Sequence, residues 1–570
     1  MRACVSTALL LLASATAQSC TPTTVCDPAA PATLDGCCNN VENPTAGALG
    51  QTFRRLAPAA YPGDGSGDTI ASTSVDGTVI YRSERVISNA VFAQTGTRCS
   101  DRDINEMHTF FGQFSNHDSH KASTDSSDAA TVTVPFDDAH FTMDMPVSRS
   151  NIVPGTGVPG IPREQANDGE SSQLDLSVVY GLNDEWLAQL RTDGGTGAFL
   201  IMNDYVHGEF PPPGDALADP SKVDVIPDTA PATGDVRAPE NPGLLTQHTI
   251  WARNHNYWAR RFRELYTVAE KSDEDVFQLA RRLNIAELQH VTVYEWLPAL
   301  GVEMPRYPGY NPTLLHAPVS EMVVGALRFG HSQLRDNLEF ADRRYNAIRT
   351  LELKEAFFTP DELTGGLLPA GGSMDVDNGG TSALLRGQVS RCGNRIDAQV
   401  VDAVRNFLFG EGAGLDLVSF NLFRARDWGI PRYNVIREAV GLSAAASFAD
   451  ITDDADVQAA LASVYDSVDD VDFWVGGLAE DHGRGKAIGP MFEAIFLEHF
   501  RTVRDGDRFW YENPGSLDAR SEEMDNDLRR RVRDTDYGDI VARNSPGLRR
   551  EDVPRNVFFV RGSDAAEGGR

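Results

Sequence analysis

The chain has 570 residues, of which 41% are hydrophobic and 23% are charged, so it is not disordered throughout. Its 51 basic and 82 acidic residues give a net charge of −31, which disfavours binding to nucleic acid and to anionic membrane surfaces. At about 150 residues per domain, length alone predicts three or four domains. The acidity is compatible with a bound hard cation such as calcium.

Residues 1–17 have the features of a secretory signal peptide. Arg2 supplies a positive charge, an apolar run follows, and Ala15 to Ala17 form the small-residue pattern that precedes cleavage. An N-terminal core helix is the alternative interpretation. The apolar run is too short to cross a bilayer, and no later stretch reaches about 18 uninterrupted apolar residues. We therefore expect a soluble, secreted protein without a membrane span.

Loss of the signal peptide would remove Cys4 and leave six cysteines. An even number in an oxidising compartment favours disulfide bonds, although six cysteines allow 15 pairings. Four of them lie between Cys20 and Cys38, which predicts a cross-linked N-terminal arm over residues 18–36. The chain lacks two matching C-x-x-C pairs, so a structural zinc site is not expected.

Helical spacing of apolar residues dominates the rest of the chain. The segments that we expect to be helical are 104–121, 244–266, 319–338 and 396–409. Short β-like pieces, such as 130–134, interrupt the region 122–170, and long loops are expected over 205–243 and 364–380. The tail 561–570 is expected to be disordered. The predicted fold class is therefore mainly α, with few short β elements and long loops.

Several common enzyme classes lack their motifs in this sequence. It contains no Gly-x-Ser-x-Gly, no P-loop, no His-Glu-x-x-His and no full EF-hand loop. Serine hydrolases, P-loop nucleotidases and the common zinc proteases are therefore disfavoured. The acidic run 466–472 is typical of a solvated turn rather than of a calcium loop.

The segment 111–118 (FGQFSNHD) offers polar side chains to two different places. On a helix, Gln113 and His117 are four residues apart and share a face. Asp118 is rotated by about 100° and faces elsewhere. Taken alone, this segment favours the simpler interpretation that His117 is an ordinary histidine near a helix end.

His331 lies within a second apolar helical pattern, beside Gly330. A core histidine is the usual interpretation of such a position. However, two histidines on separate apolar helices are what a sandwiched haem requires, one as the axial ligand and one as the acid and base. Gly330 would let a flat ligand approach the backbone.

Two further segments carry polar groups that could belong to a site. In 234–243, Arg237 and Glu240 precede a predicted helix and could point into a cavity, although a surface salt bridge is the simpler interpretation. In 171–181, oxygen-bearing side chains recur and could surround a hard cation, although a polar turn is the simpler interpretation.

Together these segments resemble the animal haem peroxidase family, which includes myeloperoxidase, peroxidasin and peroxinectin. The similarity extends over nearly the whole mature chain, and its other family-like stretches are 35–40 (DGCCNN), 85–90 (RVISNA), 162–165 (PREQ), 421–427 (NLFRARD), 475–477 (VGG), 506–513 (GDRFWYEN) and 557–559 (VFF). The resemblance implies one large helical domain over residues 37–560 instead of three or four domains.

The resemblance also implies roles around a haem b. His117 would be the distal histidine that takes a proton from H2O2 and returns it to the leaving oxygen, and Arg237 would stabilise the developing charge. Gln113 would shape the distal pocket. His331 would be the proximal iron ligand, with Asn421 accepting a hydrogen bond from its other ring nitrogen. The residues expected near the haem propionates are Arg328 and Arg424.

A calcium site is the second implication of the resemblance. Its expected ligands are Asp118, Ser171, the backbone carbonyl of Gln173, Asp175 and Ser177. One helix would then connect the haem pocket, through His117, with the calcium site, through Asp118.

Three departures from the family pattern affect covalent structure. No aspartate occurs at residues 113–116, where many members form a haem ester, so at most one ester link, through Glu240, is expected. Asn241 stands where myeloperoxidase has a sulfonium-forming methionine, so that bond should be absent. Most family disulfides are missing. Cys26–Cys38 resembles the first N-terminal one, and the partners of the other four cysteines stay open.

The predicted function is a secreted haem peroxidase that uses H2O2, through compound I, to oxidise small donors such as phenols, halides or thiocyanate. A haem fatty-acid dioxygenase of the cyclooxygenase branch is an alternative that oxygen uptake with linoleate would distinguish. An inactive adhesion or matrix protein on the same scaffold is another. Oligomeric state and the physiological donor stay open, although the acidic surface favours small neutral donors over anionic ones.

Overall fold

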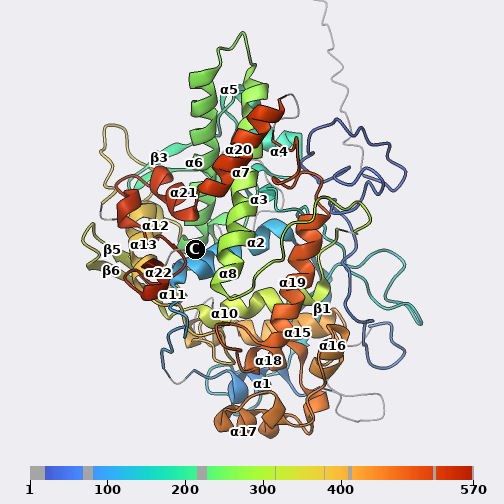
Figure 1. Cartoon of the computed structure of the whole chain (residues 1–570). Helices are drawn as coiled ribbons and strands as arrows, with labels where there is room; N and C mark the ends of the chain where they lie inside the picture. The colour runs from blue at the N-terminus through green and yellow to red at the C-terminus, as the bar shows by residue number, and fades with distance from the viewer. Residues whose placement is uncertain are drawn as a thin grey trace, which may run out of the picture.

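In a computed structural model of the chain, which describes residues 20–67, 81–94, 96–214, 227–314, 316–377, 379–408, 414–517 and 521–567, most regular structure is helical (Figure 1). The signal-peptide prediction lies outside the described residues. The longer helices are α1 (Glu84–Val91), α2 (Glu106–Ser119), α6 (Pro242–Leu265), α7 (Asp273–Val291), α13 (Gly380–Ser390), α15 (Leu417–Asp427), α17 (Ala455–Val464), α19 (Pro490–Asp505), α20 (Glu522–Asp534) and α21 (Tyr537–Asn544).

Short helices connect these longer ones. They are α3 (Ser177–Tyr180), α4 (Asp184–Leu190), α5 (Thr192–Gly195), α8 (Leu297–Ala299), α9 (Ser320–Val324), α10 (Gly330–Gln333), α11 (Leu353–Ala356), α12 (Asp361–Thr364), α14 (Asp402–Arg405), α16 (Tyr433–Ala439), α18 (Phe473–Ala479) and α22 (Asp564–Glu567). Short 3-10 segments include η2 (Ala238–Glu240) and η4 (Ala326–Phe329), and a π-helical turn, η3 (Thr292–Trp296), follows α7.

The β structure consists of three antiparallel two-stranded sheets within the described residues. They pair β1 (Thr124–Val132) with β2 (Met145–Ser150), β3 (Asn203–Tyr205) with β4 (Gly208–Phe210), and β5 (Asn337–Ala341) with β6 (Ala347–Glu352). The mainly helical fold class is thereby confirmed. None of the helices in these ranges is both long and apolar enough to cross a membrane.

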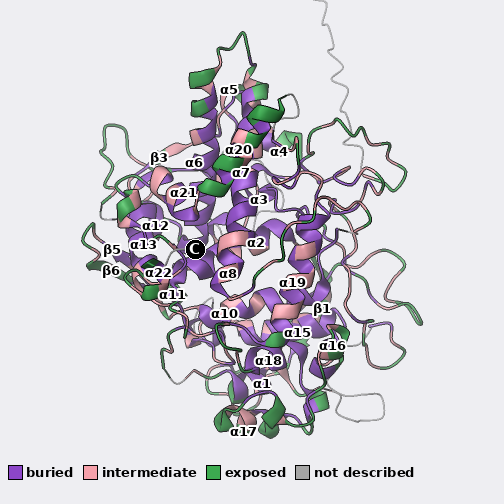
Figure 2. Ribbon diagram, in the orientation of Figure 1, coloured by how far each residue is buried: buried purple, intermediate pink, exposed green. Residues whose placement is uncertain are grey.

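The main hydrophobic core runs through the molecule and includes residues from Leu34 to Phe558, and a small second cluster lies between the β1–β2 sheet and Phe423 of α15 (Figure 2). Helix α6 is buried nearly all round, which is typical of a helix at the centre of a large domain. It begins at Pro242, with the Asn241 side chain accepting a hydrogen bond from the Leu244 amide at 2.9 Å. Segments from both halves of the chain therefore share one core.

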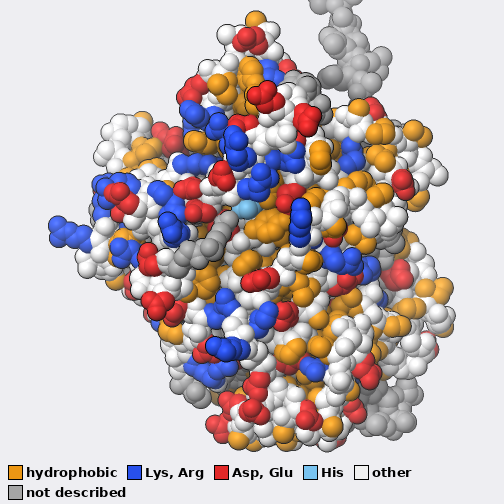
Figure 3. Space-filling model, in the orientation of Figure 1, with side chains coloured by type: hydrophobic (Ala, Val, Ile, Leu, Met, Phe, Trp, Pro, Cys, Tyr) orange, Lys and Arg blue, Asp and Glu red, His pale blue; other side chains and the backbone are white. Residues whose placement is uncertain are grey.

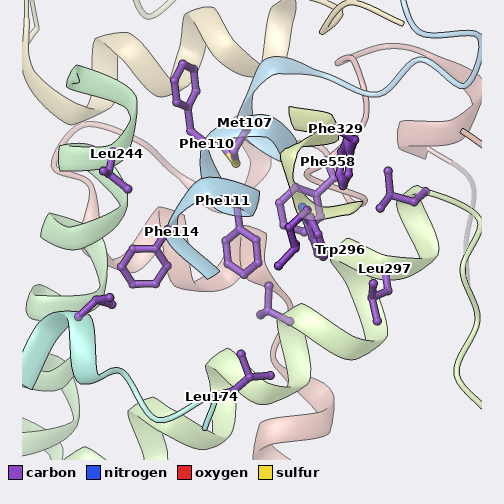
Figure 4. Close-up of a cluster of buried hydrophobic side chains, with 14 of the residues drawn as sticks. Met107, Phe110, Phe111, Phe114, Leu174, Leu244, Trp296, Leu297, Phe329 and Phe558 are labelled. Carbon is purple, nitrogen blue, oxygen red and sulfur yellow. The ribbon is translucent and has the colours of Figure 1, made fainter. Parts of the chain in front are cut away.

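Helix α2 crosses this core, and its apolar residues pack on both sides (Figure 4). Phe114 faces α6, which carries Leu244, whereas Phe111 lies between Phe114 and Trp296 of the π-helical turn. The Asn105 side chain caps α2 and also donates to the carbonyls of Val557 and Phe559, both at 2.8 Å. The helix is therefore fixed both by its packing and at its N-terminal end.

The predicted helix 319–338 is wrong as a continuous element. It is divided into α9, η4 and α10, and the chain becomes extended at Leu334. The first break lies at Gly325, whose φ of −140° and ψ of −82° are not helical. A side chain there could not fit, because a Cβ atom would lie 1.9 Å from Cε1 of Phe473. His331 therefore lies on the short helix α10.

Two other expectations also differ from the structure. Of the predicted helix 396–409, which the structure describes as far as residue 408, only α14 is helical in the described part, and Val400 instead forms an isolated bridge with Ala93. The tail that we expected to be disordered contains the short helix α22. The predicted strand 130–134 overlaps the end of β1, which is longer than expected.

Three disulfide bonds link the six described cysteines. Cys26–Cys38 is present, as predicted, and the pairs that the sequence left open are Cys20–Cys37 and Cys99–Cys392. The first two cross-link the N-terminal arm. The third joins the segment before α2 to the segment after α13, two parts of the chain that are 293 residues apart.

Candidate functional site

A cavity of about 380 Å³ lies between α2 and the η4–α10 segment. His117 and Gln113 of α2 line it, and His331 of α10 lines it as well. Its wall is otherwise largely apolar, with residues such as Phe110, Trp296, Phe329, Leu353, Phe357 and Leu417. The structure thus brings both candidate haem histidines to one cavity, although 213 residues separate them in the sequence.

His117 is 8% exposed and faces a carboxylate that the sequence analysis did not single out. Its Nδ1 lies 3.6 Å from Oδ2 of Asp235. Burial lowers the pKa of His117 well below its usual range, and the nearby Arg237 guanidinium lowers it further. His117 is therefore a neutral imidazole at neutral pH. The only sequence signal for Asp235 is its position two residues before Arg237.

Arg237 does not line the cavity. Its guanidinium is bound by Asp235, at 2.7 Å, and by Glu170, at 3.4 Å, and it also donates to the carbonyl oxygen of His117 at 3.3 Å. Burial opposes ionisation of Asp235, but the Arg237 charge, the hydrogen bond from Arg237 and other nearby positive charge together more than compensate and hold the pKa of Asp235 well below its usual range. Arg237 is therefore beside His117 but is directed away from the cavity by two carboxylates.

Glu240, Gln113 and Asn241 form a short polar chain along the cavity wall. Gln113 Nε2 donates to Glu240 Oε2 at 3.5 Å, and Asn241 Nδ2 donates to Gln113 Oε1 at 3.0 Å. Burial raises the pKa of Glu240 to about 7, although Arg237 acts in the opposite direction. Asn241 thus both orients Gln113 and caps α6. Asn116 also lines the cavity, and its buried Oδ1 has no partner among the described groups.

Asn421 lies behind His331, as the resemblance implies, but with a different atom toward the ring. Asn421 Nδ2 is 2.8 Å from His331 Nδ1, whereas Asn421 Oδ1 accepts a hydrogen bond from Arg328 at 2.8 Å. Acceptance of a hydrogen bond from the His331 ring would require a 180° rotation of the amide. Burial lowers the pKa of His331 to about 3, so its ring is the neutral form that metals bind.

Arg328 and Arg424 also line the cavity. Burial and, to a smaller extent, the neighbouring Arg424 charge together lower the pKa of Arg328 to about 9. Burial likewise lowers the pKa of Arg424, although this side chain has Asp427 at 2.9 Å. Both guanidinium groups are desolvated, and nearby negative charge does not fully compensate for this. They could therefore form ion pairs with the carboxylates of a bound group. A Cβ atom added at Gly330 would meet nothing within 4 Å, so the backbone there is open to a flat ligand.

The predicted calcium ligands meet on the other side of α2. Asp118 is fully buried and accepts hydrogen bonds from the amides of Asp175 and Leu176, both at 3.1 Å. Ser171 donates to Asp175 at 2.7 Å, and Ser177 donates to the Asp118 side chain at 3.4 Å. The structure therefore brings these four side chains together, with Gln173 in the same turn.

The charges of this loop fit a hard cation. Burial raises the pKa of Asp118 well above its usual range, and the neighbouring Asp175 raises it further. Burial also raises the pKa of Asp175, to about 6. A bound cation would offset the cost of burying two ionised carboxylates close together. The hydroxyls, carbonyls and two carboxylates of this loop are ligands that calcium accepts. No group of three or more His, Cys, Asp or Glu residues suited to a metal occurs within the described ranges.

Most of the chain is similar in sequence to known proteins. Residues 32–558 match the animal haem peroxidase family. Peroxinectin A from Dictyostelium discoideum is 34% identical over 84% of this chain and 88% of its own length. Peroxidasin from Drosophila melanogaster is 30% identical over 92% of this chain, but the match covers 36% of that longer protein.

Two solved structures share the fold. Peroxidase A from Dictyostelium discoideum superimposes with a TM-score of 0.80 at 31% identity, over 93% of this chain and 99% of that chain. A fatty acid alpha-dioxygenase from Oryza sativa gives a TM-score of 0.74 at 18% identity, over 94% of this chain and 87% of that chain. The second likeness concerns the fold alone.

Proposed function

Because the chain belongs to the animal haem peroxidase family, we propose that it is a secreted haem peroxidase that uses H2O2 to oxidise small donors. The observation that carries this proposal is the cavity that His117 and His331 both line, with Asn421 behind His331. When bound there, haem would supply the iron that reacts with H2O2. The family implies this cofactor and this oxidant.

His331 would hold the iron, and its neutral ring supports that role. Arg328 and Arg424 would bind the haem propionates, since both are desolvated cations at the cavity wall. The open backbone at Gly330 would accommodate the flat edge of the group. The residues present therefore fit a haem.

His117 would accept the proton of H2O2 and later donate it to the leaving oxygen. Its Nδ1 faces Asp235, which leaves Nε2 as the nitrogen that can exchange this proton. The lowered pKa supports a ring that is neutral, and so able to accept, at neutral pH. Gln113 would orient small molecules beside it, because Asn241 and Glu240 hold its amide in place.

Arg237 would act on this site through its positive charge. Its guanidinium is bound outside the cavity lining by Asp235 and Glu170, so in this arrangement it does not contact a molecule in the cavity. Its charge nevertheless favours the neutral form of His117. The same charge would stabilise negative charge that develops on an oxygen beside His117.

Calcium and one covalent haem link belong to the same proposal. Asp118, Ser171, the Gln173 carbonyl, Asp175 and Ser177 would hold the calcium, supported by the buried carboxylates of this loop. Glu240 would form the ester link, supported by its position in the cavity wall. The three disulfide bonds support an oxidising, extracellular location.

A donor screen tests the proposed activity. The haem-loaded protein is mixed with H2O2 and, in separate assays, with chloride, bromide, iodide, thiocyanate or a phenol. We expect H2O2-dependent oxidation of at least one donor, with the phenol or other neutral donors favoured by the acidic surface. Haem-loaded protein that oxidises none of them at a rate above free haem would contradict the proposal.

A further inference from the structure

A second cleft, of about 540 Å³, lies between the C-terminal half of α6 and the segment that follows α21. It shares no lining residue with the cavity that contains His117. The charged residues that line it are Arg253, Arg260, Arg543 and Glu209. Three cations and one carboxylate thus meet on a chain whose net charge is −31. Figure 3 shows several Lys and Arg side chains gathered near α20 and α21.

Arg253 is the buried cation of this cleft, with 7% of its surface exposed. It donates to the Asn544 carbonyl at 2.8 Å, to Thr381 at 3.2 Å and to the Glu209 carbonyl. Within the described residues it has no carboxylate partner, and its Nε has no acceptor. Burial lowers its pKa to about 10, although the nearby Glu209 carboxylate acts in the opposite direction.

Two further donors in the cleft also lack partners among the described groups. Ser545 is 2% exposed, and its hydroxyl makes no hydrogen bond. Arg260 is exposed at the rim and forms no ion pair there. The guanidinium of Arg543, in contrast, forms an ion pair with the Glu287 carboxylate at 2.5 Å. A buried guanidinium, a buried hydroxyl and a rim guanidinium together form the donor set that oxyanions require.

The remaining wall of the cleft is partly apolar, with Leu200, Met202 and Leu548. We propose that this cleft binds a small organic anion, whose carboxylate, sulfate or phosphate group contacts Arg253, Ser545 and Arg260 and whose apolar part lies against these three residues. The Ser545 hydroxyl makes no hydrogen bond among the described groups and is therefore available to donate to such an anion. The site requires neither haem nor His117, so anion binding can be tested independently of the peroxidase activity.

Binding is tested by titration calorimetry on the full mature protein with phenyl phosphate and phenylacetate, using benzyl alcohol as the neutral control. We expect both anions to bind and benzyl alcohol to bind at least about tenfold more weakly, because it cannot satisfy the donors. Equal affinity for benzyl alcohol, or no binding of either anion, would overturn the proposal.

Three substitutions locate the binding. Ser545→Ala should weaken phenyl phosphate binding by about tenfold, and Arg260→Gln by about threefold because its guanidinium is exposed. Arg261→Gln is the matched control: it removes the same charge from the next residue, which pairs with Glu264 and does not line the cleft. Thermal melting checks that each variant is folded. If Arg261→Gln weakened binding as much as Arg260→Gln, the attraction would be non-specific and the proposed site would be wrong.

Discussion

His117 and Asp118 are adjacent residues with different surroundings. His117 lines the cavity, whereas Asp118 is fully buried in the loop that contains Asp175. This separation follows from the rotation of about 100° between successive helical residues. A single peptide unit therefore connects the proposed haem and calcium sites.

Motif residues could be predicted from the sequence, but their orientations could not. The motifs identified both cavity histidines and the loop around Asp118. The direction of Arg237 depends on Glu170, which is 67 residues away, and on Asp235. The amide orientation of Asn421 depends likewise on Arg328, 93 residues away. Such contacts arise from tertiary packing, which local patterns do not encode.

Glu240 is the residue through which a covalent link to haem is expected. In the active wild-type protein, acid–acetone extraction should leave haem attached to the polypeptide, because the Glu240 carboxyl lines the cavity. Glu240→Gln should release essentially all of its haem, because this chain has no aspartate at residues 113–116 that could form a second ester. Mass spectrometry of the polypeptide measures the added haem.

Glu170→Gln is the matched control for that experiment, because Glu170 is buried nearby without lining the cavity. This variant should keep its attached haem. Complete release of haem from the active wild-type protein would show that the ester link is absent.

At the scale of elements, α2 connects two sites and is held by aromatic packing and by its Asn105 cap. Its position was predictable to within two residues, because its apolar spacing is regular. The segment 319–338 was not predictable in the same way. Its apolar spacing is helical, but the fit of Gly325 against Phe473 breaks the helix, and that contact joins residues 148 positions apart.

Calcium binding tests the role of α2. Asp118→Asn should lower calcium affinity by about tenfold or more, because it removes one of two carboxylates from the site. Metal analysis after desalting should then find calcium in the wild-type protein and little in this variant. His117→Ala changes the adjacent residue on the other face of the helix and should retain calcium. Equal calcium contents in Asp118→Asn and wild type would exclude Asp118 as a ligand.

At the scale of the whole molecule, the main hydrophobic core contains residues from both halves of the chain, and the single domain over residues 37–560 that the resemblance implies stays a prediction. The core buries several histidines, and His255 of α6 is one of them. Its ring contacts the Tyr180 hydroxyl at 3.0 Å and the Ala198 carbonyl at 3.1 Å. Burial lowers the pKa of His255 to about 3, against about 6.5 in an unfolded chain.

This shift predicts a pH dependence of stability. Between these two pKa values the unfolded chain binds the proton more readily, so His255 costs stability as the pH falls below about 6.5. Between pH 7 and pH 5 its contribution is about 2 kcal/mol. His255→Gln should be less stable at pH 7, because the ring's contacts are lost. Since the variant lacks the titrating group, its free energy of unfolding should fall by about 2 kcal/mol less than that of wild type between pH 7 and pH 5. Denaturant unfolding at pH 7 and pH 5 measures the free energy of unfolding of both proteins. If the variant lost as much of this free energy as wild type between the two pH values, the prediction would be contradicted.

In the proposed function, His117 is the proton acceptor and donor of a haem peroxidase site. The most direct test of this role is the rate of the absorbance change in the Soret region when H2O2 is mixed with haem-loaded protein in a stopped-flow instrument. His117→Ala should retain haem, because His331 is intact, but should react at least about 100-fold more slowly than wild type. A His117→Ala variant that keeps its haem and reacts at the wild-type rate would contradict the claim.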